Sequence, residues 1–414
     1  MERLPLDGIR VFDLSKVWAG PYCTRLLGDM GAEVIKVEGP GAWDLLRSLS
    51  LLGGDIERRY NRSAFFNHDN RNKYGCIIDF SQPKGRELAL RLVELSDVVV
   101  ENYRSDVLQR LGLTYEAMRE VRPDVILVSM PSHGLWGPEA DRIGYGTSME
   151  QLAGLTSLSG YADGGPLKTG ISYGDAVSGS FAAAATIAAL LRRRWTGRGQ
   201  HIELAQWETF LSMAGEFYLE RGITGRDPVR RGNRHSSMAP HGVYRCEGDD
   251  SWVAITVGSD AEFAALCRVI GQPDLVRDER FADVVSRYRN QDELDEVVSA
   301  WTRERSHYDA AAQLQEAGVP AMPVLTIPEL MADPHLAARG FWEETTHREA
   351  GTWMMDGPPW RMSLSPAHVR LPAPCFAEHN DYVLRDLLGL SEDEVSELER
   401  EGVTAREPLP GQDE

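Results

Sequence analysis

Cysteine is scarce in this chain, and its few residues form no recognisable metal or disulfide pattern. The five cysteines among 414 residues stand far apart, at positions 23, 76, 246, 267 and 375, without a CxxC pair. This spacing excludes a short-spaced zinc site and provides no disulfide framework. Reduced thiols are therefore the expected state, which favours a cytoplasmic location.

Glycine motifs for nucleotide binding are also missing. No G-x-G-x-x-G follows the first predicted strand, and the sequence contains no G-x-x-x-x-G-K-[ST]. A nicotinamide or flavin site and a nucleotide P-loop are both unsupported as a result. His68 and Asp69 stand too isolated to indicate a metal site. We expect neither a metal nor a permanently bound cofactor.

Long apolar runs and an excess of basic charge are lacking as well. The most apolar stretch, SFAAAATIAALL (180–191), is shorter than the ~20 residues that span a bilayer. The N-terminus lacks the basic and apolar regions of a signal peptide. The net charge of −19, from 44 Lys and Arg against 63 Asp and Glu, opposes binding to nucleic acid or to an anionic membrane. We expect neither as a partner, although a local basic pocket could still bind a small anion.

Strand-like and helix-like segments alternate up to residue 130. Val- and Ile-rich strands are predicted at 9–14, 32–38, 97–102 and 124–130, with helices at 23–31 and 85–96. This alternation predicts an α/β fold with a Rossmann-like parallel sheet covered by helices on both faces. Ligands of such sheets bind at the carboxyl ends of the strands, here the segments 14–21, 37–41, 101–104 and 129–134.

The order of predicted strands and helices changes after a basic, Gly-containing segment at 221–242. Strands are predicted at 251–257 and 320–325, with three helices between them, so residues 226–325 form a smaller α+β domain. Two acidic amphipathic helices are expected in the tail, at 381–390 and 391–402.

One carboxylate stands among small residues in the stretch ISYGDAVSGS (171–180), just before a predicted helix that runs to about Arg194 and is followed by a strand at 201–205. Asp175 has two interpretations. It could be a helix N-cap that accepts hydrogen bonds from free N–H groups. It could also be a catalytic carboxylate at the positive end of a helix.

Several motifs in order carry a resemblance to a known family. They are LSKVWAGPYCTRLLGDMGAEVIKVEGPG (14–41), NRNKYGCIIDFSQPKGRE (70–87), SDVVVENYRSDVLQRLGL (96–113) and GDAVSGSFAAAATIAALLRRRWTGRGQHIELAQWE (174–208). The chain resembles the class III CoA-transferases (EC 2.8.3.-), a family that includes the α-methylacyl-CoA racemases. The resemblance continues through 231–255, 318–341 and 357–366 and so covers nearly the whole chain.

The resemblance implies a fold and an assembly. Residues 1–225 would form a large CoA-binding α/β domain that the return segment 326–414 completes, with the small domain 226–325 between them. Two such chains would interlock like links, as a homodimer or as a hetero-oligomer with a homologue.

The resemblance also implies a mechanism. Asp175 matches the active-site aspartate, which moves CoA from an acyl-CoA to an acid through a mixed anhydride and an aspartyl-CoA thioester. A helix N-terminus would keep Asp175 ionised. Small neighbours would leave room for the thioester: Gly174, Ala176, Ser178 and Gly179.

By the same resemblance, the CoA site lies on the rim of strand ends. Val17 and Ala19 would contact the pantetheine through their main chain. The adenosine–phosphate end would be lined by Asn72, Lys73, Asn102 and Tyr103, with the forked guanidinium groups of Arg71 and Arg104 on phosphate. His133 follows a strand end and is a candidate substrate contact; His235 and His241 lie between the domains. Lone histidines are more often structural.

Three positions depart from related branches of the family. The racemase branch has a His where this chain has Tyr145, and a phenol with a pKa near 10 is a poor proton shuttle. Many transferases have an acidic residue at the position of Gly146. The formyl-CoA:oxalate branch has a Gln at the position of Trp18, whose ring would make the acyl pocket apolar or only fill core volume.

We therefore expect a CoA-transferase with an acceptor larger than oxalate, such as an aromatic or branched acid, and with succinyl-CoA as a donor. Two alternatives stay open. One is an α-methylacyl-CoA racemase or epimerase, and the other is a non-catalytic CoA-binding subunit of a hetero-oligomer.

Overall fold

The structure is a computed structural model that describes residues 3–49 and 59–409. Contacts within the chain divide it into a large unit, residues 1–155, 168–224 and 336–414, and a small unit, residues 156–167 and 225–335. The large unit thus takes residues from both ends of the chain. The small unit differs from the predicted domain 226–325 because it includes 156–167 and extends ten residues further.

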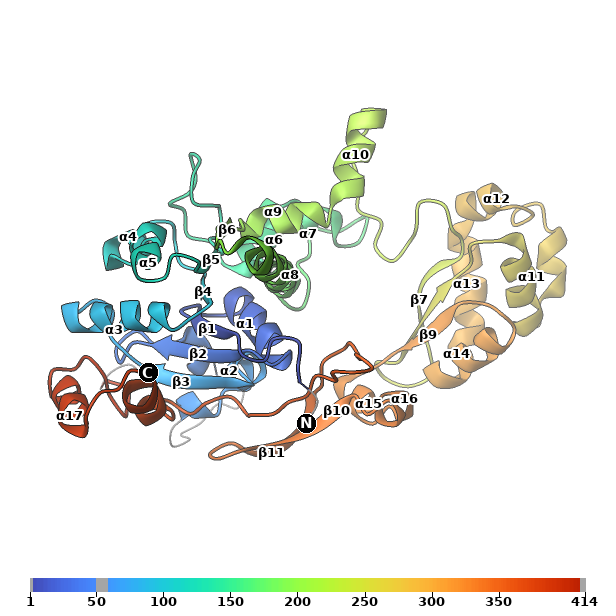
Figure 1. Ribbon diagram of the computed structural model, residues 1–414. Helices are drawn as coiled ribbons and strands as arrows, with labels where there is room; N and C mark the ends of the chain where they lie inside the picture. The colour runs from blue at the N-terminus through green and yellow to red at the C-terminus, as the bar shows by residue number, and fades with distance from the viewer. Residues whose placement is uncertain (1–2, 50–58, 410–414) are drawn as a thin grey trace. The chain divides into compact units, whose positions relative to one another are not determined.

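A six-stranded parallel sheet forms the centre of the large unit (Figure 1). Its order is β3–β2–β1–β4–β5–β6, the order of a dinucleotide-binding fold, in which the strand sequence reverses between β1 and β4. The strands are β1 (Arg10–Asp13), β2 (Glu33–Glu38), β3 (Lys73–Ile77), β4 (Val98–Glu101), β5 (Ile126–Ser129) and β6 (His201–Glu203). The predicted α/β fold with a parallel sheet is confirmed, and β3 is a strand that the sequence analysis missed.

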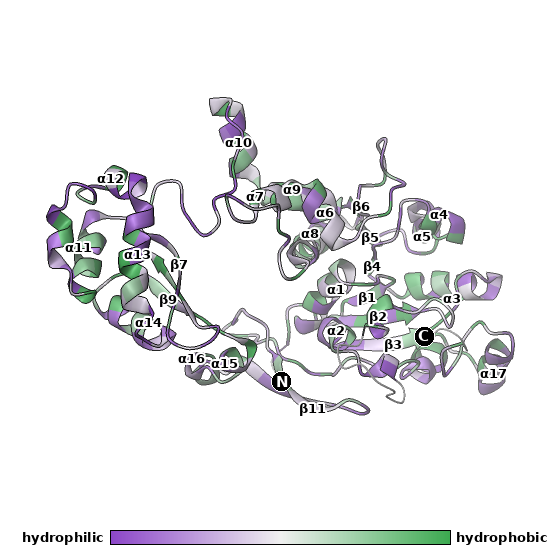
Figure 2. Cartoon of the chain, turned by 180° about the vertical axis from the view of Figure 1, so that it is seen from behind, coloured by the Kyte–Doolittle hydropathy of each residue, from purple (hydrophilic) through white to green (hydrophobic). Residues whose placement is uncertain are grey.

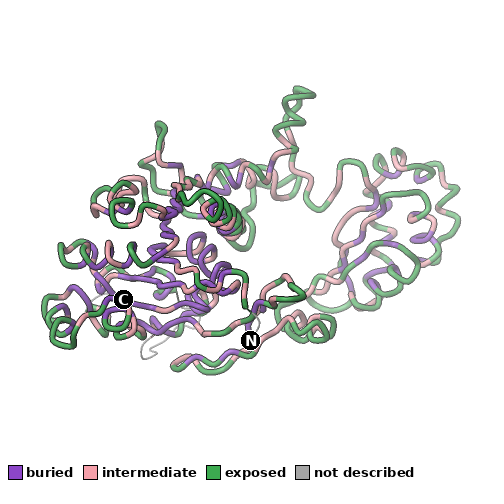
Figure 3. Tube along the Cα trace, viewed as in Figure 1, coloured by how far each residue is buried: buried purple, intermediate pink, exposed green. Residues whose placement is uncertain are grey.

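Alternation of side chains along the strands divides the core into two layers. Phe12 and Leu14 belong to the layer that α3 (Pro83–Glu94), α5 (Tyr115–Val121), a π-helix (Tyr382–Leu387) and α17 (Glu392–Arg400) cover. Val11 and Val34 belong to the other layer, under α1 (Ala19–Asp29) and α8 (Tyr173–Thr196). Helices therefore cover both faces, and buried residues concentrate on the sheet (Figure 3). The first predicted tail helix is the π-helix.

Among the residues that the structure describes, α8 is the one helix long and apolar enough to pass a length-and-composition test for a membrane span. It packs extensively against α1, and 44% of its most apolar window is buried inside the protein. The core helix of a soluble protein passes the same test. The helix ends at Thr196, and Arg193 and Arg194 lie in its last turn, where cations offset its dipole.

The large unit is completed by shorter elements around the sheet. They are α2 (Ala64–Asp69), α4 (Val107–Leu111), α6 (Gly146–Leu152), α9 (Gln206–Ser212), α10 (Gly215–Thr224) and the antiparallel hairpin of β10 (Trp342–His347) and β11 (Gly351–Asp356). Two short helices cross the division between the units, α7 (Leu155–Leu158) and α16 (Pro334–Ala338).

The small unit has its own sheet and its own hydrophobic core. The antiparallel strands are β7 (His241–Arg245), β8 (Trp252–Thr256) and β9 (Ala321–Val324). The helices are α11 (Asp260–Val269), α12 (Val284–Arg289), α13 (Gln291–Thr302), α14 (His307–Glu316) and α15 (Ile327–Met331). Hydrophobic and hydrophilic residues alternate on α13 and α14, as amphipathic helices on a sheet require (Figure 2).

Candidate active site

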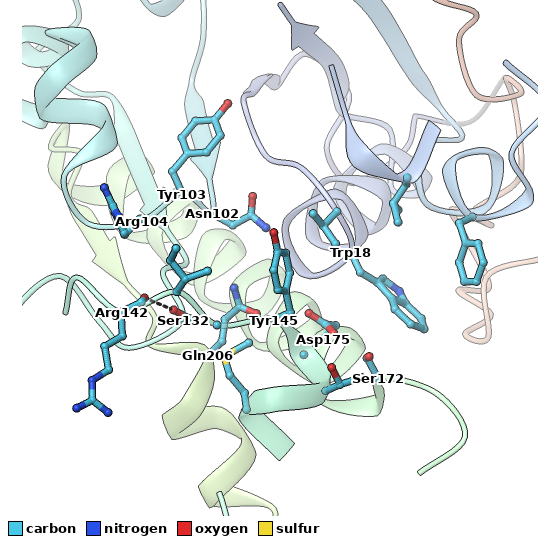
Figure 4. A pocket seen from close by; sticks show the side chains of 18 of the residues that line it. Trp18, Asn102, Tyr103, Arg104, Ser132, Arg142, Tyr145, Ser172, Asp175 and Gln206 are labelled. Atoms are coloured by element: carbon cyan, nitrogen blue, oxygen red, sulfur yellow. Dashed lines mark hydrogen bonds between the residues drawn. The ribbon is translucent and has the colours of Figure 1, made fainter. Parts of the chain in front are cut away.

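A cavity of about 360 Å³ lies at the carboxyl edge of the parallel sheet. Its walls come from the segments that follow β1, β2, β4, β5 and β6, together with α2, α6 and the start of α8. Parallel sheets place their ligands at this edge, beside the point where the strand order reverses. The lining residues include Trp18, Asn102, Tyr145, Asp175 and Gln206 (Figure 4).

Asp175 stands in the wall of this cavity, in the first turn of α8. Ser172 is the N-cap, so Asp175 is the third residue of the helix, and the N-cap interpretation is wrong. Only 7% of its surface is exposed. Burial, followed by the nearby carboxylates of Asp69 and Glu150, raises the pKa of Asp175 to about 7. The expectation that Asp175 stays ionised needs correction, because burial and two nearby carboxylates raise its pKa toward neutral pH.

Glu150 is a buried carboxylate beside the start of α8 that the sequence analysis missed. It accepts hydrogen bonds from the backbone N–H of Tyr173 at 3.0 Å and from the hydroxyl of Thr169. These bonds tie α6 to the first turn of α8 and so help to fix Asp175. In the sequence Glu150 stands between Met149 and the polar Gln151, and no pattern there singles it out.

Gly146, the first residue of α6, faces the carboxylate of Asp175. A Cβ added at Gly146 would stand 1.6 Å from Asp175 Oδ2, so no side chain fits there without moving Asp175. The second carboxylate that many transferases have at this position is thus absent. Glu150, one helical turn further along α6, brings a carboxylate close to Asp175 from another direction.

The other small residues around Asp175 serve packing between helices. A Cβ at Gly174 would come within 2.0 Å of the Phe210 ring on α9, and one at Gly179 within 2.6 Å of the Ala19 carbonyl oxygen on α1. Ser178 is hydrogen-bonded to Thr209 at 2.5 Å. The expectation that these residues leave room for a thioester is therefore wrong for Gly174, Ser178 and Gly179.

The segment after β1 places Val17 and Trp18 on the cavity, whereas Ala19 is buried within α1. Val17 adopts a left-handed backbone conformation (φ 65°), and its N–H donates to Asp44 Oδ1 at 3.0 Å. The indole N–H of Trp18 is buried and finds no acceptor among the described residues. A polar group of this kind in a cavity wall is available to a ligand.

Asn102, Tyr103 and Arg104 follow β4 and line the cavity, and their contact with CoA stays a prediction. Asn102 Oδ1 accepts a hydrogen bond from the Lys16 backbone N–H at 2.8 Å, and Asn102 Nδ2 donates to the Lys16 carbonyl at 2.7 Å. These two bonds fix the segment after β1. Burial raises the pKa of Tyr103. Arg104 is exposed and pairs with Asp106 at 2.7 Å.

Arg142 also lines the cavity, and no sequence signal identified it. Its carbonyl accepts a hydrogen bond from Ser132 at 3.3 Å, drawn as a dashed line in Figure 4. Its exposed side chain extends away from Asp175 in Figure 4 and pairs with Glu139 at 3.0 Å.

The structure does not bring Arg71, predicted on phosphate, or Asn72 and Lys73, predicted at the adenosine–phosphate end of CoA, to this cavity. All three side chains are buried. Arg71 pairs with Asp29 at 2.8 Å, and the Asn72 amide donates to the same carboxylate at 2.6 Å. Lys73 pairs with Asp13 at 3.1 Å, and burial lowers its pKa to about 8. These residues stabilise the framework beneath the site because their charges already have partners.

Of the other candidates, Tyr145 lines the cavity and is more than half exposed, while His133 stands behind the wall. His133 hydrogen-bonds to Ser132 at 2.9 Å and its ring contacts Trp207. His235 and His241 contact each other in the small unit. Within residues 3–49 and 59–409, no group of three or more His, Cys, Asp or Glu could hold a metal ion.

Comparison with known proteins gives consistent results over nearly the whole chain. The family described as CoA-transferase family III matches residues 6–380. Succinyl-CoA–D-citramalate CoA-transferase of Chloroflexus aurantiacus is 35% identical over 400 residues, covering 96% of this chain and 98% of that one. Succinate–glutarate CoA-transferase of Agrobacterium fabrum is 34% identical, covering 92% and 96%.

A solved structure shares the fold. The crystal structure of a CAIB/BAIF family protein from Brucella suis has a TM-score of 0.85 and 32% identity, covering 93% of this chain and all of that one. A buried carboxylate at the ligand-binding edge of a Rossmann-like sheet, the family match and the similarity of sequence and structure all agree. The chain belongs to the family III CoA-transferases and is an enzyme whose substrates are CoA thioesters and carboxylic acids.

Proposed function

We propose that this enzyme transfers CoA from succinyl-CoA to a carboxylic acid, with Asp175 as the nucleophile. The observation that carries the proposal is the Asp175 carboxylate in the wall of the cavity, facing a glycine rather than a side chain. The names of two similar transferases, which act with succinyl-CoA or succinate, support the donor.

The proposed reaction keeps the activated acyl bond throughout. The Asp175 carboxylate attacks the thioester carbonyl, the C–S bond breaks, and CoA leaves as the thiolate while a mixed anhydride forms. The thiolate attacks the Asp175 carbonyl and releases succinate, which leaves an aspartyl-CoA thioester. The acceptor carboxylate attacks this thioester and forms a second anhydride. The thiolate then attacks the acceptor's carbonyl, which gives the new acyl-CoA and regenerates Asp175.

The surroundings of Asp175 suit a nucleophile. A carboxylate with little water around it is poorly stabilised and therefore reactive. Because the attacking form is the carboxylate and burial raises the pKa of Asp175 to about 7, activity is expected to rise with pH through this value.

CoA is proposed to bind on the side of the cavity that β1 and β4 provide. Val17, Asn102 and Tyr103 would line the path of the pantetheine. Arg104 and Arg142 would bind phosphate groups, since each is exposed and its carboxylate partner can be exchanged for a phosphate.

The test is a transfer assay with a panel of acyl-CoA donors and carboxylic acids, with the product CoA esters separated by chromatography. Wild type should form a new CoA ester with succinyl-CoA as the donor, and Asp175→Asn should lose this activity. Asp386→Asn, an exposed change on the π-helix, is the matched control and should retain it. Transfer by Asp175→Asn at the rate of wild type would contradict the proposal.

The racemase alternative requires a second proton-transfer group opposite Asp175. Among the described residues, the cavity lining contains no histidine, and Tyr145 stands at the position of the racemase histidine. Exchange of an acyl α-proton with deuterium from solvent, without any CoA transfer, is the result that would favour the racemase.

We also propose that the enzyme is a homodimer in the cytoplasm, interlocked as the family resemblance implies. Large apolar side chains on α8 support an interface: Phe181, Leu191 and Trp195 are exposed, Trp195 by 79%. All five cysteines are buried and free, in keeping with a reducing compartment. Light scattering should give the mass of two chains at micromolar concentration, whereas the mass of one chain would contradict the dimer.

A further inference from the structure

Gln206 is the first residue of α9 and stands at the β6 side of the cavity. Its backbone N–H donates to the Pro131 carbonyl at 3.0 Å, and that of Trp207 donates to Ser132 at 3.0 Å. These bonds attach the start of α9 to the segment that follows β5. Only 5% of Gln206 is exposed, so its side chain is packed in the protein rather than mobile at the surface.

The orientation of the Gln206 amide is determined by its neighbour. Nε2 donates to the Met130 carbonyl at 2.7 Å, and a carbonyl can only accept. The amide nitrogen must therefore point to Met130, which leaves Oε1 on the other side. Oε1 is buried and has no donor among the described residues. Buried acceptors in native proteins normally have a partner, so this one is available to a ligand in the cavity.

We propose that Gln206 Oε1 accepts a hydrogen bond from a hydroxyl group of the acceptor acid, so that the enzyme selects hydroxy-substituted carboxylic acids. An ionised carboxylate has no hydrogen to donate and cannot satisfy Oε1, whereas a hydroxyl next to the reacting carboxylate can. In Figure 4, Gln206 and Asp175 stand in the same cavity with Tyr145 beside them. This inference rests on the proposed reaction at Asp175.

The amide N–H groups of pantetheine are the other donors that could reach the cavity. Position favours the acid: Gln206 follows β6, while the residues proposed for the pantetheine follow β1 and β4, with β5 between them in the sheet. A CoA contact would change the KM of the acyl-CoA, and an acid contact would change the choice between acids, so the two are separable.

The test compares wild type and Gln206→Met with matched acids that differ by one hydroxyl, with succinyl-CoA as the donor. The pairs are 2-hydroxyglutarate against glutarate, and malate against isotope-labelled succinate, whose CoA ester is then distinguishable from the donor. In wild type, kcat/KM should favour the hydroxy acid of at least one pair about tenfold. Gln206→Met should remove most of this preference and change the deoxy acid less than threefold, since one neutral hydrogen bond gives a factor of about ten. Both acids react with the same folded molecules, so their ratio does not depend on how much variant folds.

A structural control is available on the same helix. The hydroxyl of Thr209 donates to the Gln206 carbonyl at 2.6 Å and pairs with Ser178, without lining the cavity. Thr209→Val should lower the melting temperature and keep the preference for the hydroxy acid.

Three results would overturn the inference. The first is equal use of hydroxy and deoxy acids by wild type. The second is a rise in the acyl-CoA KM of Gln206→Met with the acid preference unchanged, which would assign Gln206 to pantetheine. In both, transfer itself persists and the proposed function stands. The third, no transfer to any acid, would remove the proposed function and this inference with it.

Discussion

Asp175 is held in surroundings that disfavour its charged form, and Glu150 contributes to them. The two buried carboxylates repel each other, and this repulsion adds to the desolvation that raises the pKa of Asp175 to about 7. The enzyme would operate near this pKa, where a fraction of Asp175 is ionised at neutral pH and its reactivity is high.

Glu150→Gln should lower the apparent pKa of the reaction. Removal of a negative charge favours ionisation of Asp175, and the Gln oxygen can still accept from Tyr173 and Thr169. The rise of kcat/KM with pH should therefore shift to lower pH, with activity at pH 6 increased relative to activity at pH 8. Glu208→Gln, an exposed change on α9, is the control. An unshifted profile for Glu150→Gln would show that its charge does not act on the nucleophile.

Trp18→Gln should change the choice of acceptor acid. The indole provides an apolar wall to the cavity, and a glutamine would favour smaller and more polar acids. Relative kcat/KM values for oxalate and for an aromatic or branched acid measure the change. An unchanged preference would show that Trp18 only fills volume.

Single residues show what the sequence could and could not predict about the site. Asp175 was identified by its motif. Arg71 was predicted on phosphate and Lys73 at the adenosine–phosphate end of CoA. The sequence did not reveal that their ion-pair partners are Asp29 and Asp13, about 40 and 60 residues away, which become neighbours only in the fold. Gln206 was missed because an unsatisfied buried oxygen is a property of three-dimensional packing.

At the scale of elements, α8 holds the nucleophile by close contact with α1 and α9. Glycines at two points let the helices approach, Gly179 toward α1 and Gly174 toward the Phe210 ring. Such contacts fix the first turn of α8 with little freedom, and the geometry of Asp175 depends on them.

Gly174→Ala should destabilise the enzyme, by about 1–3 kcal/mol, because the added methyl overlaps the Phe210 ring. Phe210→Leu alone should also destabilise it, through a cavity. The double variant should lose less free energy of unfolding than the sum of the two single losses. The smaller leucine leaves space for the added methyl, and the methyl fills part of the cavity that the leucine leaves. Urea unfolding of the four proteins measures this coupling, and strictly additive effects would mean that the two residues do not compete for space.

Strands with apolar runs were predictable, and so was the short strand β6, whereas β3 and β10 were not. β1, β2, β4 and β5 are valine- or isoleucine-rich and buried. β3 begins with the buried Lys73 and contains Gly75, and β10 reads WEETTH, so neither shows the pattern of a core strand. Their positions follow from partners: β3 pairs with β2, and β10 with β11.

For the whole molecule, the raised pKa of Asp175 reduces the free energy of unfolding at neutral pH. A carboxyl group whose pKa is about 7 when folded and 3.8 in the unfolded chain binds more protons in the folded state between these values. Folding stability therefore falls as pH rises from about 4 to 7 on account of this group. Glu38 acts in the opposite sense: Arg47 and other partners hold its pKa at about 2, and its contribution is lost as pH falls below 4.5.

Asp175→Asn should accordingly raise the melting temperature, and more at pH 8 than at pH 5. The variant removes a buried charge that exists mainly above pH 7, and an increase of about 2 °C at pH 8 is expected. Differential scanning calorimetry of both proteins at the two pH values gives the comparison. An increase of equal size at both pH values would contradict a titrating Asp175.

The central claim is that Asp175 becomes covalently bound to CoA, and mass spectrometry of the trapped enzyme tests it most directly. The enzyme is incubated with succinyl-CoA and treated with borohydride, which reduces an aspartyl thioester to an alcohol, or with hydroxylamine, which converts it to a hydroxamate. Peptide mapping should place the change on Asp175, and Asp175→Asn should show none. Turnover of succinyl-CoA with Asp175 unmodified under both reagents, or modification at another residue, would contradict the account.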